Sequence, residues 1–104
     1  MEKVSDLIRK EILGLPNVKE GVSRYESRPA FLVNGREFAH FHNEEELDIR
    51  LPFKAQKIRN ASPNPYSSKW LYFKVGTIED ARTVLRLIKQ AYQKAVNEEK
   101  YDYG

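Results

Sequence analysis

The chain has 104 residues, a formal net charge of +3 at pH 7, 32% charged residues and no cysteine. Its length fits one domain, and the lack of cysteine excludes disulfides, thiolate metal sites and cysteine nucleophiles. No apolar run approaches the roughly 18 residues that span a bilayer, and the chain starts on a charged amphipathic segment rather than a secretory signal. We therefore expect a cytoplasmic protein that does not bind membranes.

The N-terminal part predicts a helix and an edge strand. Apolar residues at helical spacing indicate a helix over residues 2–14, and Gly14, followed by Leu15-Pro16, is a stop signal. The run 21–27 is typical of a strand, and Pro29 at its end favours an edge position.

A tight hairpin is the clearest local prediction. Asn34-Gly35 stands between two β-rich runs, and both residues tolerate the positive φ of a type I′ turn. A two-residue turn fixes the register, so that Val33 faces Arg36, Leu32 faces Glu37 and Phe31 faces Phe38. Strict alternation then places on one face Phe31, Val33, Phe38, His40 and His42. The opposite face is expected to carry Ala30, Leu32, Ala39 and Phe41, so that both faces are substantially apolar.

The second half predicts two more strands and two helices. Thr77 is the expected N-cap of the last helix, with Glu79 and Asp80 near the positive end of its dipole. The expected elements are a strand over 47–51, a short helix over 52–59, a loop over 60–68, a strand over 69–75, a helix over 77–96 and a frayed tail over 97–104.

This order of elements indicates an α+β fold in a single domain, 1–104. We expect a two-layer sandwich, in which an antiparallel sheet of about five strands carries the N-terminal and C-terminal helices on one face. Because two helices cover only one face, the apolar second face of the hairpin predicts an exposed aromatic patch.

Four stretches of the sequence together form a recognisable motif pattern. They are EFAHFH (37–42), LDIRLP (47–52), SKWLYFKV (68–75) and the helical run 79–92. The pattern combines H-x-H, L-x-L-P, a lone Trp opening a strand and an Ala-Tyr pair near a helix end. Its places are filled by His40, His42, Leu51, Pro52, Trp70 and Tyr92. Over residues 22–95 the chain resembles a family of small proteins called the luciferase domain family. More distantly, the element order resembles YjbR-like domains, which are related in shape to frataxin. That second resemblance implies an α-β sandwich and nucleic-acid binding, and neither family supplies a catalytic residue.

His40-x-His42 is the only histidine pair, and alternation places both imidazoles on one strand face. Such a pair supplies two nitrogens to a Zn, Ni or Fe ion, with Asp48 or a nearby Glu as third ligand, which makes a metal-binding protein or metal-dependent enzyme one alternative. His40 near Asp48 also suits an acid–base pair. The spacing fixes no third and fourth ligand and no catalytic motif is complete, so we predict no tight structural metal, no cofactor and a non-enzymatic role.

The leading functional prediction is a binding or self-association domain that uses the open face of the sheet. The tentative ligand-binding residues are His40, His42, Asp48, Arg50, Lys69, Trp70, Tyr72 and Lys74. A homodimer formed through the same face is the rival interpretation.

A basic second half suggests a further alternative, the binding of nucleic acid or another polyanion. Residues 50–94 hold ten basic and two acidic residues, a net charge of +8. The tentative polyanion-binding residues are Lys54, Lys57, Arg59, Arg82, Arg86 and Lys89. Basic side chains interleaved with aromatic rings suit single-stranded nucleic acid, although a solvated helix face is the usual explanation of such charges.

Overall fold

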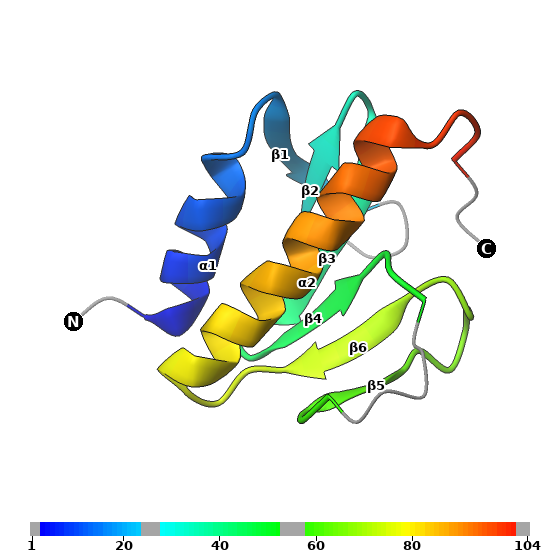
Figure 1. Cartoon of the computed structure of the whole chain (residues 1–104). Coiled ribbons are helices and arrows are strands. Elements are labelled where there is room, and N and C mark those ends of the chain that lie inside the picture. The colour runs from blue at the N-terminus through cyan, green and yellow to red at the C-terminus, as the bar shows by residue number, and fades with distance from the viewer. Residues whose placement is uncertain (1–2, 24–27, 53–57, 102–104) are drawn as a thin grey trace.

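A computed structural model describes residues 3–23, 28–52 and 58–101, which form two helices and a six-stranded antiparallel sheet (Figure 1). The elements in chain order are α1 (Val4–Leu13), β1 (Val18–Val22), β2 (Pro29–Val33), β3 (Arg36–Asn43), β4 (Glu46–Ile49), β5 (Ala61–Pro63), β6 (Leu71–Lys74) and α2 (Ile78–Asn97). The strands are ordered β1-β2-β3-β4-β6-β5. The predicted α+β class is confirmed, with one strand more than expected.

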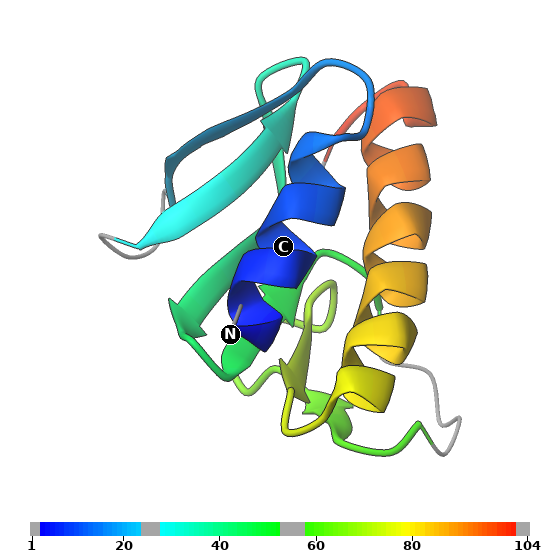
Figure 2. The same cartoon turned by 90° about the vertical axis from the view of Figure 1, so that its left-hand side faces the viewer.

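Both helices lie side by side on one face of the sheet, as the two perpendicular views show (Figures 1 and 2). α2 runs across β2, β3 and β4, and α1 packs between α2 and β1. Within the described part of the chain, neither helix is both long enough and apolar enough to cross a membrane. Among the described residues, the other face of the sheet carries no helix.

The apolar core fills the space between the helices and the sheet. Cross-strand partners share a face, and the pairs Leu47–Phe73 and Ile49–Leu71 put four buried side chains under α2. The helix contributes one buried stripe, Ala81, Val84, Leu87, Ile88, Ala91, Tyr92 and Ala95. Burial of this stripe holds the central strands β3, β4 and β6 in fixed positions.

The start of α2 follows the prediction closely. Thr77 caps the helix, since its hydroxyl accepts a hydrogen bond from the Asp80 backbone N–H, while the Asp80 carboxylate accepts one from the Thr77 N–H. The carboxylate accepts hydrogen bonds from the backbone N–H groups of Gly76 and Thr77 and from the Asn60 side chain, and these bonds keep the pKa of Asp80 below its ordinary value. The helix start is thereby locked to the end of β6.

The first turn of the chain differs from the prediction. Gly14 caps α1 in a right-handed conformation (φ −78°), and the left-handed residue is Asn17 (φ 63°). The chain therefore reverses early enough for β1 to begin at Val18 rather than at residue 21. β1 is an edge strand, as predicted, but Pro29 opens β2, where it pairs with Val22. Residues 24–27, in the C-terminal half of the predicted strand, lie outside the described residues.

The loop predicted over 60–68 contains the strand β5, which pairs with β6 at the second edge of the sheet. Its composition is that of a loop, and Pro63 is tolerated because it lies on an edge strand. Residues 53–57 of the predicted short helix lie outside the described residues, and Ile58 and Arg59 are not helical. The prediction of a frayed tail is wrong for residues 98–101, because Tyr101 is half-buried against the core.

Candidate functional site

Three central strands bring polar side chains together on the face without helices. Antiparallel pairing sets His40 on β3 directly opposite Asp48 on β4, and Asp48 directly opposite Tyr72 on β6. His42 lies two residues along β3 and so points to the same face. The ladder that builds the core on one face therefore builds a polar row on the other.

A β-bulge in β3 adds Glu37 to this row. Leu32 pairs with Glu37 and Phe31 pairs with Ala39, so that Phe38 is an extra residue in the ladder. The predicted pairing of Phe31 with Phe38 is therefore wrong, although the turn at Asn34-Gly35 (φ 53° and 77°) is confirmed.

The extra residue changes which side chains share a face. Phe38 joins the core, where its ring contacts Tyr92 of α2, and Phe31 and Val33 are also buried there. Glu37, three residues before His40, shares the face of His40 instead of the opposite one. Sequence analysis missed Glu37 as a site residue. Two adjacent apolar residues, Phe38-Ala39, interrupt the alternation of β3 and are the local signal for the bulge.

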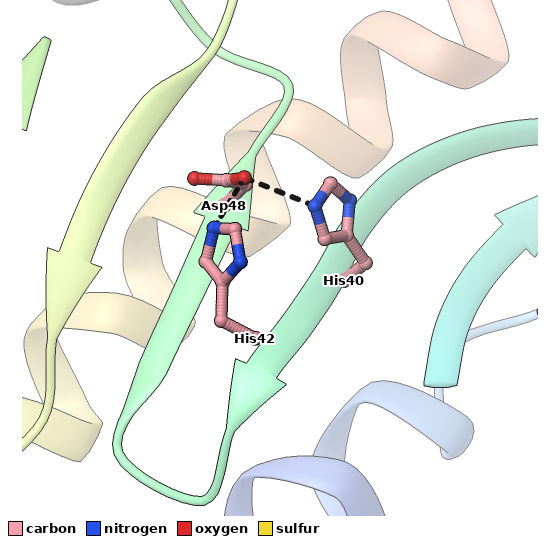
Figure 3. Close-up of side chains that lie close together, drawn as sticks. All are labelled: His40, His42 and Asp48. Carbon is pink, nitrogen blue, oxygen red and sulfur yellow. Dashed lines mark ion pairs between the residues drawn. The ribbon is translucent and has the colours of Figure 1, made fainter. Parts of the chain in front are cut away.

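Both imidazoles point at one oxygen atom (Figure 3). Asp48 Oδ2 lies 3.0 Å from Nε2 of His40 and 2.7 Å from Nε2 of His42. The other ring nitrogen of His40, Nδ1, lies 2.9 Å from Glu37 Oε2, and the Ser23 hydroxyl donates to the same oxygen at 2.9 Å. The result is a continuous chain of carboxylate, imidazole, carboxylate and imidazole, which we call the Glu37–His42 cluster: Glu37, His40, Asp48 and His42.

The cluster holds a proton on His40. Burial by itself lowers the pKa of His40, but the hydrogen bonds to Asp48 and Glu37 and the two negative charges outweigh it and raise the pKa to about 9. Both ring nitrogens of His40 therefore carry protons at neutral pH, and each faces a carboxylate.

One polar atom of the cluster has no partner among the described residues. Asp48 Oδ1 is buried and accepts no hydrogen bond from any of them. A buried carboxylate oxygen without a donor is unfavourable by about 1–3 kcal/mol. This oxygen belongs to the carboxylate on which both imidazoles converge.

Aromatic rings enclose the cluster on the helix-free face. The ring of Trp70 lies 5.3 Å from that of His40, and the ring of Tyr72 lies 6.2 Å from that of His42. Burial raises the pKa of Tyr72 to about 12, aided by the hydrogen bond that its hydroxyl donates to Glu46.

The expected exposed aromatic patch is not present, because Trp70 is 3% exposed and His40 and Asp48 are equally covered. Only His42, with 30% of its side chain exposed, links the cluster to solvent. Access to the site therefore runs past His42 and the half-buried Tyr72.

The structure divides the other predicted ligand-binding residues. Lys74 is exposed and lies opposite Glu46, and Lys69 is half-buried just before Trp70. Arg50 is buried away from the histidines, with its guanidinium 4.5 Å from the ring centre of Tyr101 and 3.6 Å from Glu98. Thus His40, His42, Asp48, Trp70 and Tyr72 come together, while Arg50 belongs to a second group around the C-terminus.

The predicted polyanion-binding residues do not lie in one described cluster. Arg82, Arg86 and Lys89 are exposed on α2, and Arg59 is exposed after the undescribed segment. Lys54 and Lys57 lie outside the described residues. Arg82, Arg86 and Lys89 belong to the helical layer, whereas the residues of the polar cluster belong to the strands of the sheet.

The donor atoms of His40, His42 and Asp48 lie within 4.8 Å of one another. Two ligands about 2.1 Å from an ion, on neighbouring corners of an octahedron, are about 3.0 Å apart. The two Nε2–Oδ2 separations, 3.0 and 2.7 Å, are close to this spacing. Glu37, behind His40, is placed as the carboxylate that commonly orients a metal-binding histidine.

Comparison with known proteins gives one family. The family model described as Luciferase domain matches residues 35–91, which include β3, β4, β6 and most of α2. No curated protein matches the chain. The matched segment contains all four residues of the Glu37–His42 cluster.

Proposed function

The chain belongs to the Luciferase domain family, whose model covers more than half of its residues, and on this premise we propose that it is a metal-binding domain. The proposed ligand is one divalent transition-metal ion, held by His40 Nε2, His42 Nε2 and the Asp48 carboxylate. The observation that carries the proposal is the convergence of both imidazoles on one buried carboxylate oxygen.

The charges of the cluster suit a divalent ion. With both histidines neutral, Glu37 and Asp48 leave a net charge of −2 on the four side chains, which a divalent cation balances. Without an ion, protons on the two Nε2 atoms occupy the space between the rings and Asp48. Metal binding thus replaces protons, as it does at other histidine sites.

The ligand types restrict the choice of ion. Imidazole nitrogen suits Zn, Fe, Ni and Cu, whereas Mg²⁺ and Ca²⁺ prefer sites made of oxygen alone. Two histidines and one carboxylate on one side of an ion leave the remaining coordination positions open. His42 and Tyr72 form the half-exposed side of the site, from which a further ligand would reach the ion.

A cytosolic location, a homodimer and polyanion binding stay predictions. The homodimer was predicted because an apolar patch was expected to be exposed, and the buried Trp70 removes that reason. The exposed Arg82, Arg86 and Lys89 are compatible with polyanion binding and with an ordinary solvated helix.

Calorimetric titration of the tag-free, chelator-treated protein with Co²⁺ and Zn²⁺ tests the proposal. We expect one ion per chain, and a Co²⁺ absorption spectrum that indicates nitrogen and oxygen ligands. His42→Ala should weaken binding at least about 10- to 100-fold, because it removes a ligand while disturbing only a half-exposed side chain.

The matched control is Glu45→Gln, which removes an exposed carboxylate in the turn between β3 and β4 and leaves the cluster intact. It should bind Co²⁺ as the wild type does. Wild-type protein that takes up no ion, or His42→Ala that binds as tightly as wild type, would show that the cluster is not a metal site.

A further inference from the structure

The chain continues past α2 and returns to the strand that carries the cluster. α2 ends at Asn97, and four residues later the Tyr101 hydroxyl donates a hydrogen bond of 2.9 Å to the backbone carbonyl of Glu37. Tyr101 is half-buried and packs against the core. Two residues 64 positions apart in sequence are thus joined at the residue behind His40.

Two arginines hold Tyr101 in this position. The Arg50 guanidinium lies 4.5 Å from the Tyr101 ring centre, and the Arg36 guanidinium lies 5.4 Å from it. Arg36 also donates hydrogen bonds to the carbonyls of Ala95 and Glu98, at 2.9 and 2.5 Å, at the end of α2. Arg36 precedes Glu37 on β3, so the C-terminal segment is fastened to the strand at two successive residues.

The hydrogen bond from Tyr101 falls at the weak point of the ladder. Glu37 immediately precedes Phe38, the extra residue of the bulge, where regular pairing is interrupted. A bond from outside the sheet therefore fixes the orientation of the peptide on which the Glu37 side chain is mounted. That side chain in turn holds Nδ1 of His40 at 2.9 Å.

We infer that Tyr101 is a positioning residue for the metal site: its hydroxyl fixes Glu37 at the bulge, and Glu37 fixes His40. This inference rests on the proposed function, since the site that it serves is the proposed metal site. Tyr101 acts through Glu37, whose backbone carbonyl accepts its hydrogen bond.

Tyr101→Phe tests the inference, because it keeps the ring between the arginines and removes only the hydroxyl. Tyr66→Phe is the control, since Tyr66 is 93% exposed and its hydroxyl is in water. We expect Tyr101→Phe to weaken Co²⁺ binding about 3- to 10-fold and to shift the Co²⁺ absorption bands, as loss of an outer-shell partner does. Tyr66→Phe should change neither. A role in stability alone would lower the unfolding midpoint without changing the spectrum of the folded, loaded protein.

A second measurement needs no metal and separates the two proposals. In the chelator-treated protein, NMR follows the exchange with solvent of the His40 Nδ1 proton that points at Glu37. We expect Tyr101→Phe to speed this exchange several-fold, and Tyr66→Phe to leave it unchanged. If the wild type binds no Co²⁺, the metal proposal fails, and faster exchange in Tyr101→Phe still supports the positioning of His40. If neither the exchange rate nor the Co²⁺ spectrum responds to Tyr101→Phe, Tyr101 is only a packing residue and the inference is overturned.

Discussion

His40 lies between two carboxylates, and its protonation is therefore coupled to the stability of the folded protein. Burial opposes its charge, but Asp48 and Glu37 raise its pKa from 6.5 to about 9. Between these two values the folded state keeps a proton that the unfolded state has lost. The stabilisation is thus complete below pH 6.5 and disappears as the pH rises through 9.

We predict that the free energy of unfolding of the metal-free protein falls by up to about 3 kcal/mol between pH 6 and pH 9.5. Urea denaturation at several pH values, with a chelator present, measures it. Glu37→Gln removes one of the two carboxylates and should flatten the dependence. If the free energy of unfolding of the wild type does not change over this pH range, His40 does not carry the additional proton in the folded state.

Glu37 contributes to metal affinity without being a ligand. Its carboxylate accepts a hydrogen bond from the Nδ1–H group of His40, which would orient Nε2 toward a bound ion. We predict that Glu37→Gln weakens Co²⁺ binding about 10- to 100-fold while one ion per chain is retained. Equilibrium dialysis against Glu45→Gln checks this prediction, and equal affinities of the two variants would exclude a role for Glu37.

At the scale of elements, the hairpin between β2 and β3 depends on one glycine. Gly35 has φ 77°, and a Cβ added there meets no atom within 4 Å, so that only the backbone conformation opposes a side chain. We predict that Gly35→Ala lowers the free energy of unfolding by about 1–2 kcal/mol. Urea denaturation measures this change.

Gly76→Ala is the matched control, because Gly76 has no positive φ and its added Cβ would make only an ordinary contact, 3.5 Å from Asp80. Its effect should stay within about 0.5 kcal/mol. If both variants lose the same stability, the turn is not held in the left-handed region.

Elements set by local chemistry could be predicted, and those set by pairing could not. The Asn34-Gly35 turn and the Thr77 cap follow from residues next to one another in sequence. β5 exists only because β6 offers it an edge. The bulge at Phe38 depends on where β2 and β3 fit best. One extra residue was enough to put His40 and His42 on the face opposite Phe38, with which they were expected to share a face.

For the same reason, only some residues of the candidate site could be predicted from the sequence. His40, His42 and Asp48 were identified from alternation and proximity in sequence. Glu37 needs the bulge, Ser23 needs the pairing of β1 with β2, and Tyr101 needs the return of the C-terminal segment. The contacts of Ser23 and Tyr101 join segments that are distant in sequence, and local patterns contain no information about them.

At the scale of the whole molecule, the two layers separate two surfaces. The Glu37–His42 cluster lies on the face of the sheet without helices, and Arg82 and Arg86 are exposed on α2 in the other layer. Exposed charges separated by more than the Debye length, about 8 Å at physiological salt, are largely screened from each other. The metal site and the basic surface should therefore behave independently.

We predict that Arg82→Glu combined with Arg86→Glu leaves Co²⁺ affinity and stability unchanged. The same change should reduce affinity for a single-stranded oligonucleotide, and should lessen its dependence on salt, because fewer counterions are released. Fluorescence titration with the oligonucleotide at low and high salt measures both the affinity and its dependence on salt. A double variant that binds Co²⁺ differently would contradict the independence of the two layers.

The bulge at Phe38 also has a consequence for recognising other chains that share this site. The spacing that builds it is Glu37-x-x-His40-x-His42, followed after five residues by Asp48. In a regular strand a glutamate three positions before a histidine faces away from it, and only the inserted residue turns both to one side. A relative that keeps the interval of three but has a regular strand would keep H-x-H and point its glutamate into the core. The diagnostic pattern for this centre is therefore the glutamate, the paired histidines and the aspartate together with the bulge between the glutamate and the first histidine, and not the histidines alone.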